Sequence, residues 1–249
     1  MKHLFFLMTI VQIFSFTARA GIRKWVDIDA PAPNSLKKYE KGIKDSDLES
    51  FKKDVLQAEN KAVPLLVQVM KDQHFSIKAR WISTFLLTRI MQDKATPFIT
   101  KFSTHPEWAM RLAALKSLLI LKEKNSMVYE KALRDSSMLV RVQALENVRH
   151  LRMAELSPQI WNMLYHEENY QGDKQNKGGR ERASILSSVI RALGELNYQT
   201  AKPYMLKMIK SDKYSDLFLA LDFSLGKITG KPSPSGSVQS KRRYWKQIT

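Results

Sequence analysis

The residues most capable of chemistry in this sequence are basic side chains that recur at a constant spacing. Five similar segments, four of which carry a proline near their start, place polar residues four and seven positions after the proline column. Positions three apart share one face of a helix, six of these ten residues are basic, and none is acidic, so we expect a stripe that attracts anions. The stripe comprises Lys71, Lys101, Lys131, Arg134, Lys207 and Lys210, with Tyr165 in the same register.

Patterns that support catalysis or metal binding are missing from the sequence. The histidines beyond residue 20 (His74, His105, His150 and His166) stand alone, without the spacing of a zinc site. There is no phosphate-binding loop and no nucleophile motif. The chain has no cysteine, which excludes disulfides, thiolate catalysis and Cys-ligated metals. We therefore expect no enzymatic activity, no cofactor, no metal and no small-molecule substrate.

The charge of the chain indicates the kind of partner. The 249 residues include 41 Lys and Arg against 24 Asp and Glu, a formal charge of +17. Such an excess favours acidic partners. A protein with an acidic surface fits best; an anionic polymer or a membrane surface also fits, and nucleic acid fits less well. A solvated lysine surface without any ligand explains the composition equally well.

The first 20 residues match the parts of a secretory signal peptide. Lys2 is followed by an apolar run from Leu4 to Phe16 and by the small-x-small pattern Ala18-Arg19-Ala20. A membrane helix needs roughly 20 apolar residues, so an uncleaved anchor is the weaker alternative. We expect cleavage after Ala20 and a periplasmic or secreted protein. Residues 21–45, which include Pro31 and Pro33, are expected to form an extended leader.

The elements that position the stripe are helices repeated along residues 46–230. One set aligns on a terminal hydrophobic pair, such as Leu118/Leu121 or Val148/Leu151, at successive offsets of 31, 30, 45 and 32. The proline-containing segments form a second set between them, because proline suits a first helical turn. Each unit is two antiparallel helices in about 31 residues, which bury their apolar faces only by stacking on neighbouring units.

The segments "VPLLVQVMKDQHFSIKAR", "HPEWAMRLAALKSLLIL", "RDSSMLVRVQAL" and "RALGEL" resemble HEAT repeats of the short bacterial type. The resemblance implies an all-α fold, a right-handed α–α superhelix of about five to six helix pairs, with the second set of helices along its concave surface. It also implies a structural ladder in which arginines at the seams between repeats pair with aspartates of the turns. The ladder residues are Asp72, Arg80, Arg111, Asp135 and Arg141.

Two regions depart from the repeat. The segment between His166 and Arg180 is a polar, glycine-rich insertion, so we expect a surface loop with or without a binding role. Residues 231–249 form a basic tail around Tyr244 and Trp245. We expect this tail to cap the last repeat, although basic residues interleaved with aromatic ones also suit nucleic acid or a membrane surface.

These patterns predict an exported binding or scaffolding module whose basic concave face holds an acidic protein or an anionic polymer of the envelope. The alternative is a nucleic-acid-binding enzyme of the alkylpurine DNA glycosylase type, since those enzymes also use HEAT-like repeats with a basic concave face. They need an acidic residue among aromatic ones in the concavity. The ten stripe positions hold no acid, and only Glu130 is expected near Trp161 and Tyr165.

Overall fold

A computed structural model describes residues 31–171, 181–182 and 185–248, whose regular elements are helices apart from two strands of two residues each. The all-α class predicted from the sequence is confirmed. β1 (Tyr170–Gln171) and β2 (Glu181–Arg182) pair antiparallel, with Tyr170 opposite Arg182. The α-helices are α2 (Leu48–Ala58), α3 (Val63–Lys71), α4 (Ile77–Met91), α5 (Thr96–Phe102), α6 (Trp108–Ile120), α7 (Ser126–Ala132), α8 (Met138–His150), α9 (Ser157–Asn162), α10 (Ile185–Glu195), α11 (Lys202–Lys210), α12 (Phe218–Thr229) and α13 (Val238–Gln247).

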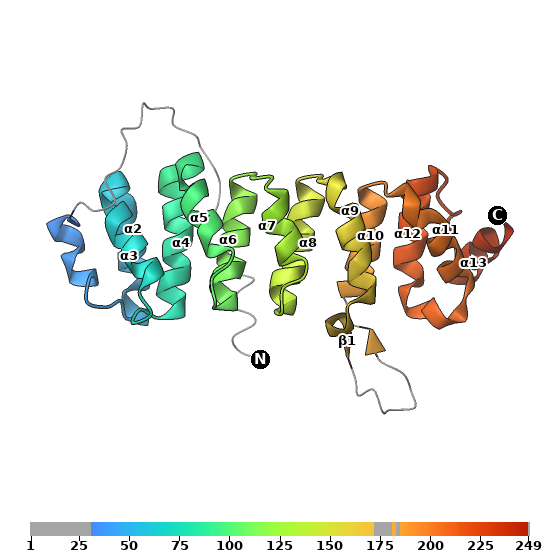
Figure 1. Cartoon of the computed structure of the whole chain (residues 1–249), viewed down its shortest axis with the longest axis horizontal. Helices are drawn as coiled ribbons and strands as arrows, with labels where there is room; N and C mark the ends of the chain where they lie inside the picture. Colours follow the sequence, from blue (N-terminus) through green and yellow to red (C-terminus); the bar gives the residue numbers. More distant parts are fainter. Residues whose placement is uncertain (1–30, 172–180, 183–184, 249) are drawn as a thin grey trace.

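The helices stand side by side in an elongated array (Figure 1). One layer is a continuous row in which α2 packs on α4, α4 on α6, α6 on α8, α8 on α10 and α10 on α12. The second layer lies against this row, with α3 on α4, α5 on α6, α7 on α8, α9 on α10 and α11 on α12. The two helix sets recognised in the sequence are therefore these two layers, and α2 extends the first by one helix.

Local sequence determines where these helices begin and end. Prolines occupy the first turn of α3, α5, α9 and α11, as predicted. Two residues after the ends of α6 and α8, Lys122 and Arg152 each adopt a φ of 54°. The next N–H then donates to a carbonyl five residues back, at 3.0 Å from Glu123 to Leu118. The hydrophobic pair that marks the repeat, here Leu118/Leu121, therefore also marks the helix stop.

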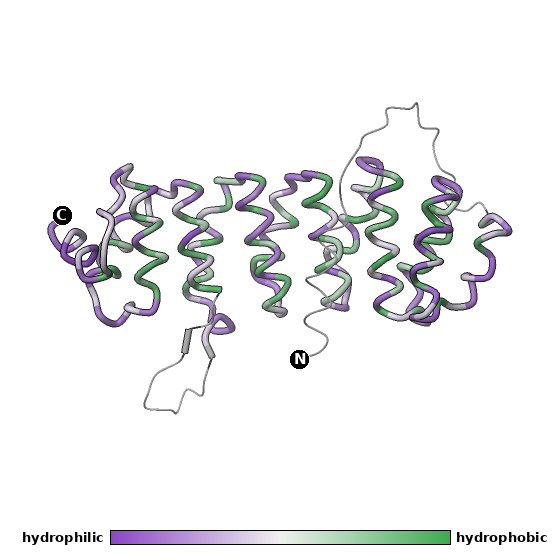
Figure 2. The backbone as a smooth tube through the Cα atoms, turned by 180° about the vertical axis from the view of Figure 1, so that it is seen from behind, coloured by the Kyte–Doolittle hydropathy of each residue, from purple (hydrophilic) through white to green (hydrophobic). Residues whose placement is uncertain are grey.

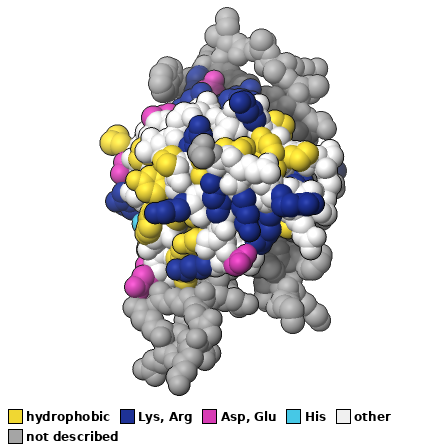
Figure 3. All heavy atoms as spheres, turned by 90° about the vertical axis from the view of Figure 1, so that its right-hand side faces the viewer, with side chains coloured by type: hydrophobic (Ala, Val, Ile, Leu, Met, Phe, Trp, Pro, Cys, Tyr) yellow, Lys and Arg dark blue, Asp and Glu magenta, His cyan; other side chains and the backbone are white. Residues whose placement is uncertain are grey.

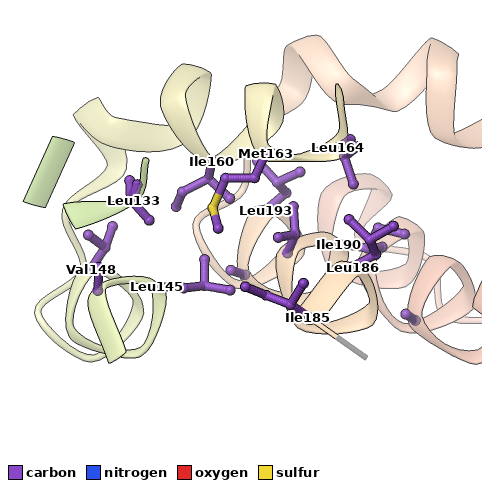
Figure 4. Close-up of a cluster of buried hydrophobic side chains, with 14 of the residues drawn as sticks. Leu133, Leu145, Val148, Ile160, Met163, Leu164, Ile185, Leu186, Ile190 and Leu193 are labelled. Atoms are coloured by element: carbon purple, nitrogen blue, oxygen red, sulfur yellow. The ribbon is translucent and has the colours of Figure 1, made fainter. Parts of the chain in front are cut away.

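The core lies between the two layers, and apolar residues alternate with polar ones along each helix (Figure 2). Figure 4 shows Leu145 and Val148 of α8 beside Ile160 and Met163 of the second layer and Leu193 of α10. All five are buried. The array is thus held together by apolar contacts between successive units, as stacking of incomplete units requires.

The backbones of α10 and α12 approach each other closely. A Cβ atom on Gly194 would lie 2.5 Å from the Cα of Ser224, so only glycine fits at this position. The hydroxyl of Ser224 donates to the carbonyl of Ile190 at 2.7 Å. The glycine of the "RALGEL" segment therefore allows backbone contact between neighbouring units.

The expected extended leader is wrong for its described part. Asn34–Tyr39 forms a 3₁₀-helix (η2), and Leu36, Tyr39 and Ile43 are buried. Tyr39 packs edge-on against Phe51 of α2 and donates its hydroxyl to Asp54 at 2.8 Å. The segment folds because these apolar residues cover the exposed end of the array. Residues 21–30, together with the signal peptide and cleavage site expected in residues 1–20, lie outside the described residues.

The tail forms helix α13, which packs against α11 at the other end of the array. Trp245 is completely buried, and its indole N–H donates to Asp222 of α12 at 2.7 Å. Lys241 donates to the second carboxylate oxygen of Asp222 at 2.8 Å. The tail therefore covers the last repeat, and Trp245 is not exposed for stacking on an external ligand.

Candidate functional site

The arginines at the seams between repeats bond to the turn of the following unit. Arg111 of α6 makes two hydrogen bonds, each of 2.7 Å, to the carboxylate of Asp135, which lies in the turn before α8. It also donates to the carbonyls of His105 and Pro106 at 2.8 Å. Both partners of the pair are largely buried. Arg111 and Asp135 thus join two neighbouring units.

Arg80 also bonds to the turn of the following unit. It therefore does not pair with Asp72, one of the two aspartates expected in the ladder. Arg80 of α4 donates to Glu107 at 2.8 Å and lies 3.1 Å from His105, both in the turn before α6. Asp72 lies in the turn before α4 itself. Its carboxylate accepts hydrogen bonds from the backbone and ring of His74 at 2.9 Å, which lower its pKa. An arginine reaches the turn of the following unit, so Asp72 is out of register for Arg80.

Arg141 completes the series without a carboxylate. It donates to the side chain of Asn169 at 3.0 Å and to the carbonyls of Asp135 and Glu168 at 2.7 and 3.1 Å. Burial lowers the pKa of this guanidinium. Arg80, Arg111 and Arg141 are therefore satisfied inside the protein, and their role is structural.

The stripe residues have the opposite environment. All seven are exposed in the second layer. Among the described residues, no carboxylate lies within ion-pair distance of Lys71, Lys101, Lys131 or Lys207. Arg134 has only a distant partner, Glu130 at 3.7 Å, and Lys210 donates to the carbonyl of Ile248 at 2.7 Å. The layer thus presents cations whose charge is not neutralised by the protein.

The two layers differ in how closely their helices pack. Among the described residues, consecutive helices pack closely along the row from α2 to α12, whereas no two of α3, α5, α7, α9 and α11 make comparable contact. The stripe belongs to the more widely spaced layer. Its expected placement on a concave surface stays a prediction.

The wider spacing leaves a cavity of about 600 Å³ between the second-layer segments around α9 and α11. Its lining combines aromatic residues with the aliphatic side chains of Leu164, Leu186, Met208 and Leu217. The aromatic residues are Trp161, Tyr165, Tyr170, Tyr204 and Tyr214. The ring of Trp161 lies 6.1 Å from that of Tyr165 and 5.6 Å from that of Tyr204, centroid to centroid. We call this cavity the aromatic pocket.

The aromatic pocket is also basic. Lys207 and Lys213 line it beside Ser211, and no Asp or Glu is among its described lining residues. The Nζ of Lys213 lies 5.7 Å from the ring centre of Tyr214. Of the stripe residues, the structure brings Tyr165 and Lys207 together here, while Lys71, Lys101, Lys131, Arg134 and Lys210 lie outside the pocket.

The basic character increases toward the C-terminal end of the array. Residues 196–249 contain ten Lys or Arg and three Asp or Glu, which gives this part of the chain a formal charge of +7. Figure 3 views this end, and Lys and Arg side chains spread over it with few acidic ones. Arg242 pairs with Asp212 at 2.8 Å, but Arg243 and Lys246 are exposed. The aromatic pocket thus lies within the most positive part of the molecule.

A second, smaller cavity of about 370 Å³ adjoins Arg80, His105 and Glu107. Burial, together with the nearby charge of Arg80, lowers the pKa of His105. The Nδ1 atom of His105 accepts a hydrogen bond from the backbone N–H of Glu107 at 3.0 Å. Asp135 and Asp72 make the same contact two residues ahead in their own turns. His105 therefore takes the turn position of an aspartate.

A scan against protein-family models found no matching family, and a search of the curated proteins found no matching relative. In the part of the chain that the structure describes, no group of three or more His, Asp or Glu side chains is arranged to hold a metal ion. The helices described are also too short or too polar to cross a bilayer.

Proposed function

We propose that the chain is an exported helical-repeat protein of the HEAT-like type, a right-handed α–α superhelix that works as a binding or scaffolding module. The basic stripe on its second layer, which we place on the concave face, binds an anionic partner of the envelope, either an acidic protein or an anionic polymer. The tail and η2 close the two ends, so the sides of the array remain as the surface on which a partner docks.

One observation carries this proposal. Lys101 and Lys131 occupy equivalent places on α5 and α7, and Lys71 lies about one turn further along on α3. All three are exposed and lie near no carboxylate among the described residues. The arginines of the first layer are instead bonded internally. First-layer helices packed at about 8–10 Å set the repeat of the array, so cations of successive units lie roughly one Debye length or more apart, a spacing that a polyanion can match.

The geometry favours this function over the glycosylase alternative. An enzyme of that type needs a carboxylate beside the bound base, and none is among the described residues that line the aromatic pocket. Glu130, the one acid expected nearby, lies 3.7 Å from Arg134 instead. The lack of a carboxylate in the described lining supports a binding surface over an enzyme of this type.

The test compares two charge-reversal variants of equal size. In the first, Lys71, Lys101, Lys131 and Arg134 become Glu; in the control, the exposed cations Lys53, Arg89, Lys122 and Arg152 become Glu. Binding of fluorescent poly-L-glutamate and of polygalacturonate is titrated at low and high salt. We expect the first variant to lose at least about tenfold in affinity for one polymer, because several opposed charges are reversed. Equal losses in both variants would contradict the proposal.

A further inference from the structure

We propose that the aromatic pocket is a subsite for an acidic saccharide, a pyranose ring that carries a carboxylate. This inference deepens the proposed function, because it names the ligand class for the part of the second layer that contains Lys207. It commits to an anionic glycan over an acidic protein.

The aromatic rings indicate a sugar. Tyr165 and Tyr204 keep 67% and 56% of their surface exposed, so aromatic faces stand in water at the pocket. The ring of Trp161 is inclined by 68° to Tyr165 and by 48° to Tyr204, so the three rings form adjoining walls. The C–H face of a pyranose packs against such walls. Phenolic hydroxyls both donate and accept hydrogen bonds, which suits the hydroxyl groups of a sugar.

The charges indicate that the sugar is acidic. Lys207 and Lys213 are the cations of the lining, and the described lining contains no carboxylate that would repel an anion. The lining contains no arginine either. Because the planar guanidinium is the preferred group for phosphate and nucleic acid, lysine alone fits a single carboxylate better than a phosphate backbone.

The shape separates the pocket from the alternatives. A cavity of about 600 Å³ lies within the range of small-ligand sites, roughly 300–1,000 Å³. The flat surface of a globular protein does not fill such a cavity. Trp161 contacts both Tyr165 and Tyr204, so these rings do not face each other across a slot that would clamp a base.

The pocket binds this sugar without cleaving it. Glycoside hydrolysis requires two carboxyl groups on either side of the bond, and the described lining supplies none. The rings and lysines therefore hold one unit of a chain, and the lysines along α7, α5 and α3 provide charge for further units of the same polymer.

The experiment is a calorimetric titration of the full mature chain with trigalacturonate and with its methyl ester. The ester keeps the rings and removes the charges. We expect trigalacturonate to bind and the ester to bind at least about tenfold more weakly, because charged hydrogen bonds to lysine are lost. Quenching of tryptophan fluorescence by trigalacturonate reports binding at Trp161, one of the five tryptophans.

Three variants assign the binding to the pocket. Y165A/Y204A removes two exposed rings and should reduce affinity for both sugars by about tenfold. K207Q/K213Q should abolish the difference between acid and ester. K53Q/R89Q, the control with two exposed cations of the first layer, should bind the trisaccharide like the parent protein.

The proposal is overturned if trigalacturonate does not bind, or if the pocket variants bind it like the parent. Tighter binding of hexathymidylate or of triglutamate would overturn it in favour of nucleic acid or an acidic peptide. The proposed function fails separately: if the charge-reversal variant captures polyanions normally while trigalacturonate still binds at the pocket, the stripe is not the binding surface and the saccharide subsite stands.

Discussion

Arg111 and Asp135, 24 positions apart in the chain, face each other through two hydrogen bonds of 2.7 Å across the seam between neighbouring units. Arg80 and Arg141 reach forward to the corresponding turns and meet Glu107 and Asn169. The series shows that each first-layer helix is bonded to the turn of the next unit. The array is thus braced by polar contacts at one end of its helices in addition to its apolar core.

The Arg111–Asp135 pair can be tested by truncation. We expect D135A to lower the free energy of unfolding by about 2–3 kcal/mol, because it leaves a mostly buried guanidinium unpaired. D72A removes a turn aspartate that has no arginine partner and should be milder. Urea denaturation followed by circular dichroism measures both, and an equal loss in the two variants would contradict the forward ladder.

His105 should make stability depend on pH. Its pKa is lowered in the folded protein by burial and by Arg80. The unfolded chain therefore takes up a proton first as the pH falls, and the stability contributed by neutral His105 is full above about pH 6.5 and lost as the pH falls through the folded pKa. In melting curves from pH 7.5 to 5, H105N should lose less stability on acidification than the parent. Parallel curves would refute this role.

The contact between Trp245 and Asp222 should hold the tail in place. Burial alone would raise the pKa of Asp222, but hydrogen bonds from Lys241, Ser233 and Trp245 outweigh it and hold the pKa below its usual value. W245F keeps an aromatic ring and removes the N–H, and we expect a loss of about 1–3 kcal/mol. R243A, at an exposed position of the same helix, serves as the control. Faster hydrogen exchange confined to α13 and α12 would locate the effect.

The helix stops contain strain that glycine would relieve. Lys122 and Arg152 each adopt a φ of 54°, which costs a residue with a Cβ atom about 1 kcal/mol or more. K122G and R152G should therefore raise the unfolding free energy, since the left-handed conformation is already present. K124G lies at a nearby position whose φ is not positive, and it should lower the unfolding free energy or leave it unchanged. A stability loss in both stop variants would contradict this geometry.

The sequence determines the layers through patterns that need no tertiary knowledge. Apolar columns ending at pairs such as Leu118/Leu121, together with prolines in first turns, identify both helix sets. Pro31 and Pro33 favour an extended leader, whereas Leu36, Tyr39 and Ile43 have the spacing of one helix face and become buried. A repeat pattern also does not reveal which neighbouring turn an arginine reaches, so it does not exclude Asp72 as a partner of a seam arginine.

The aromatic pocket was harder to foresee. Trp161 and Tyr165 stand four residues apart and Tyr204 follows a first-turn proline, so each is visible as an aromatic residue on a polar face. Their meeting depends on the gap between α9 and α11, and Tyr170 reaches the gap from β1, within the insertion. Sequence periodicity carries no information about the spacing between helices of the same layer. Lys213 and Tyr214 also lie outside every repeated column.

The most direct measurement of the central claim is site-specific photo-crosslinking in native cells. A photoreactive phenylalanine analogue replaces Gln68 or Thr104, exposed neighbours of the stripe lysines, or Gln57 or Arg152, exposed positions at the first layer. We expect crosslinks to an acidic protein or anionic polymer of the envelope from Gln68 and Thr104. These crosslinks should be lost when Lys71, Lys101 and Lys131 become Glu. Crosslinks that arise equally from Gln57 and Arg152, or that survive the charge reversal, would contradict it.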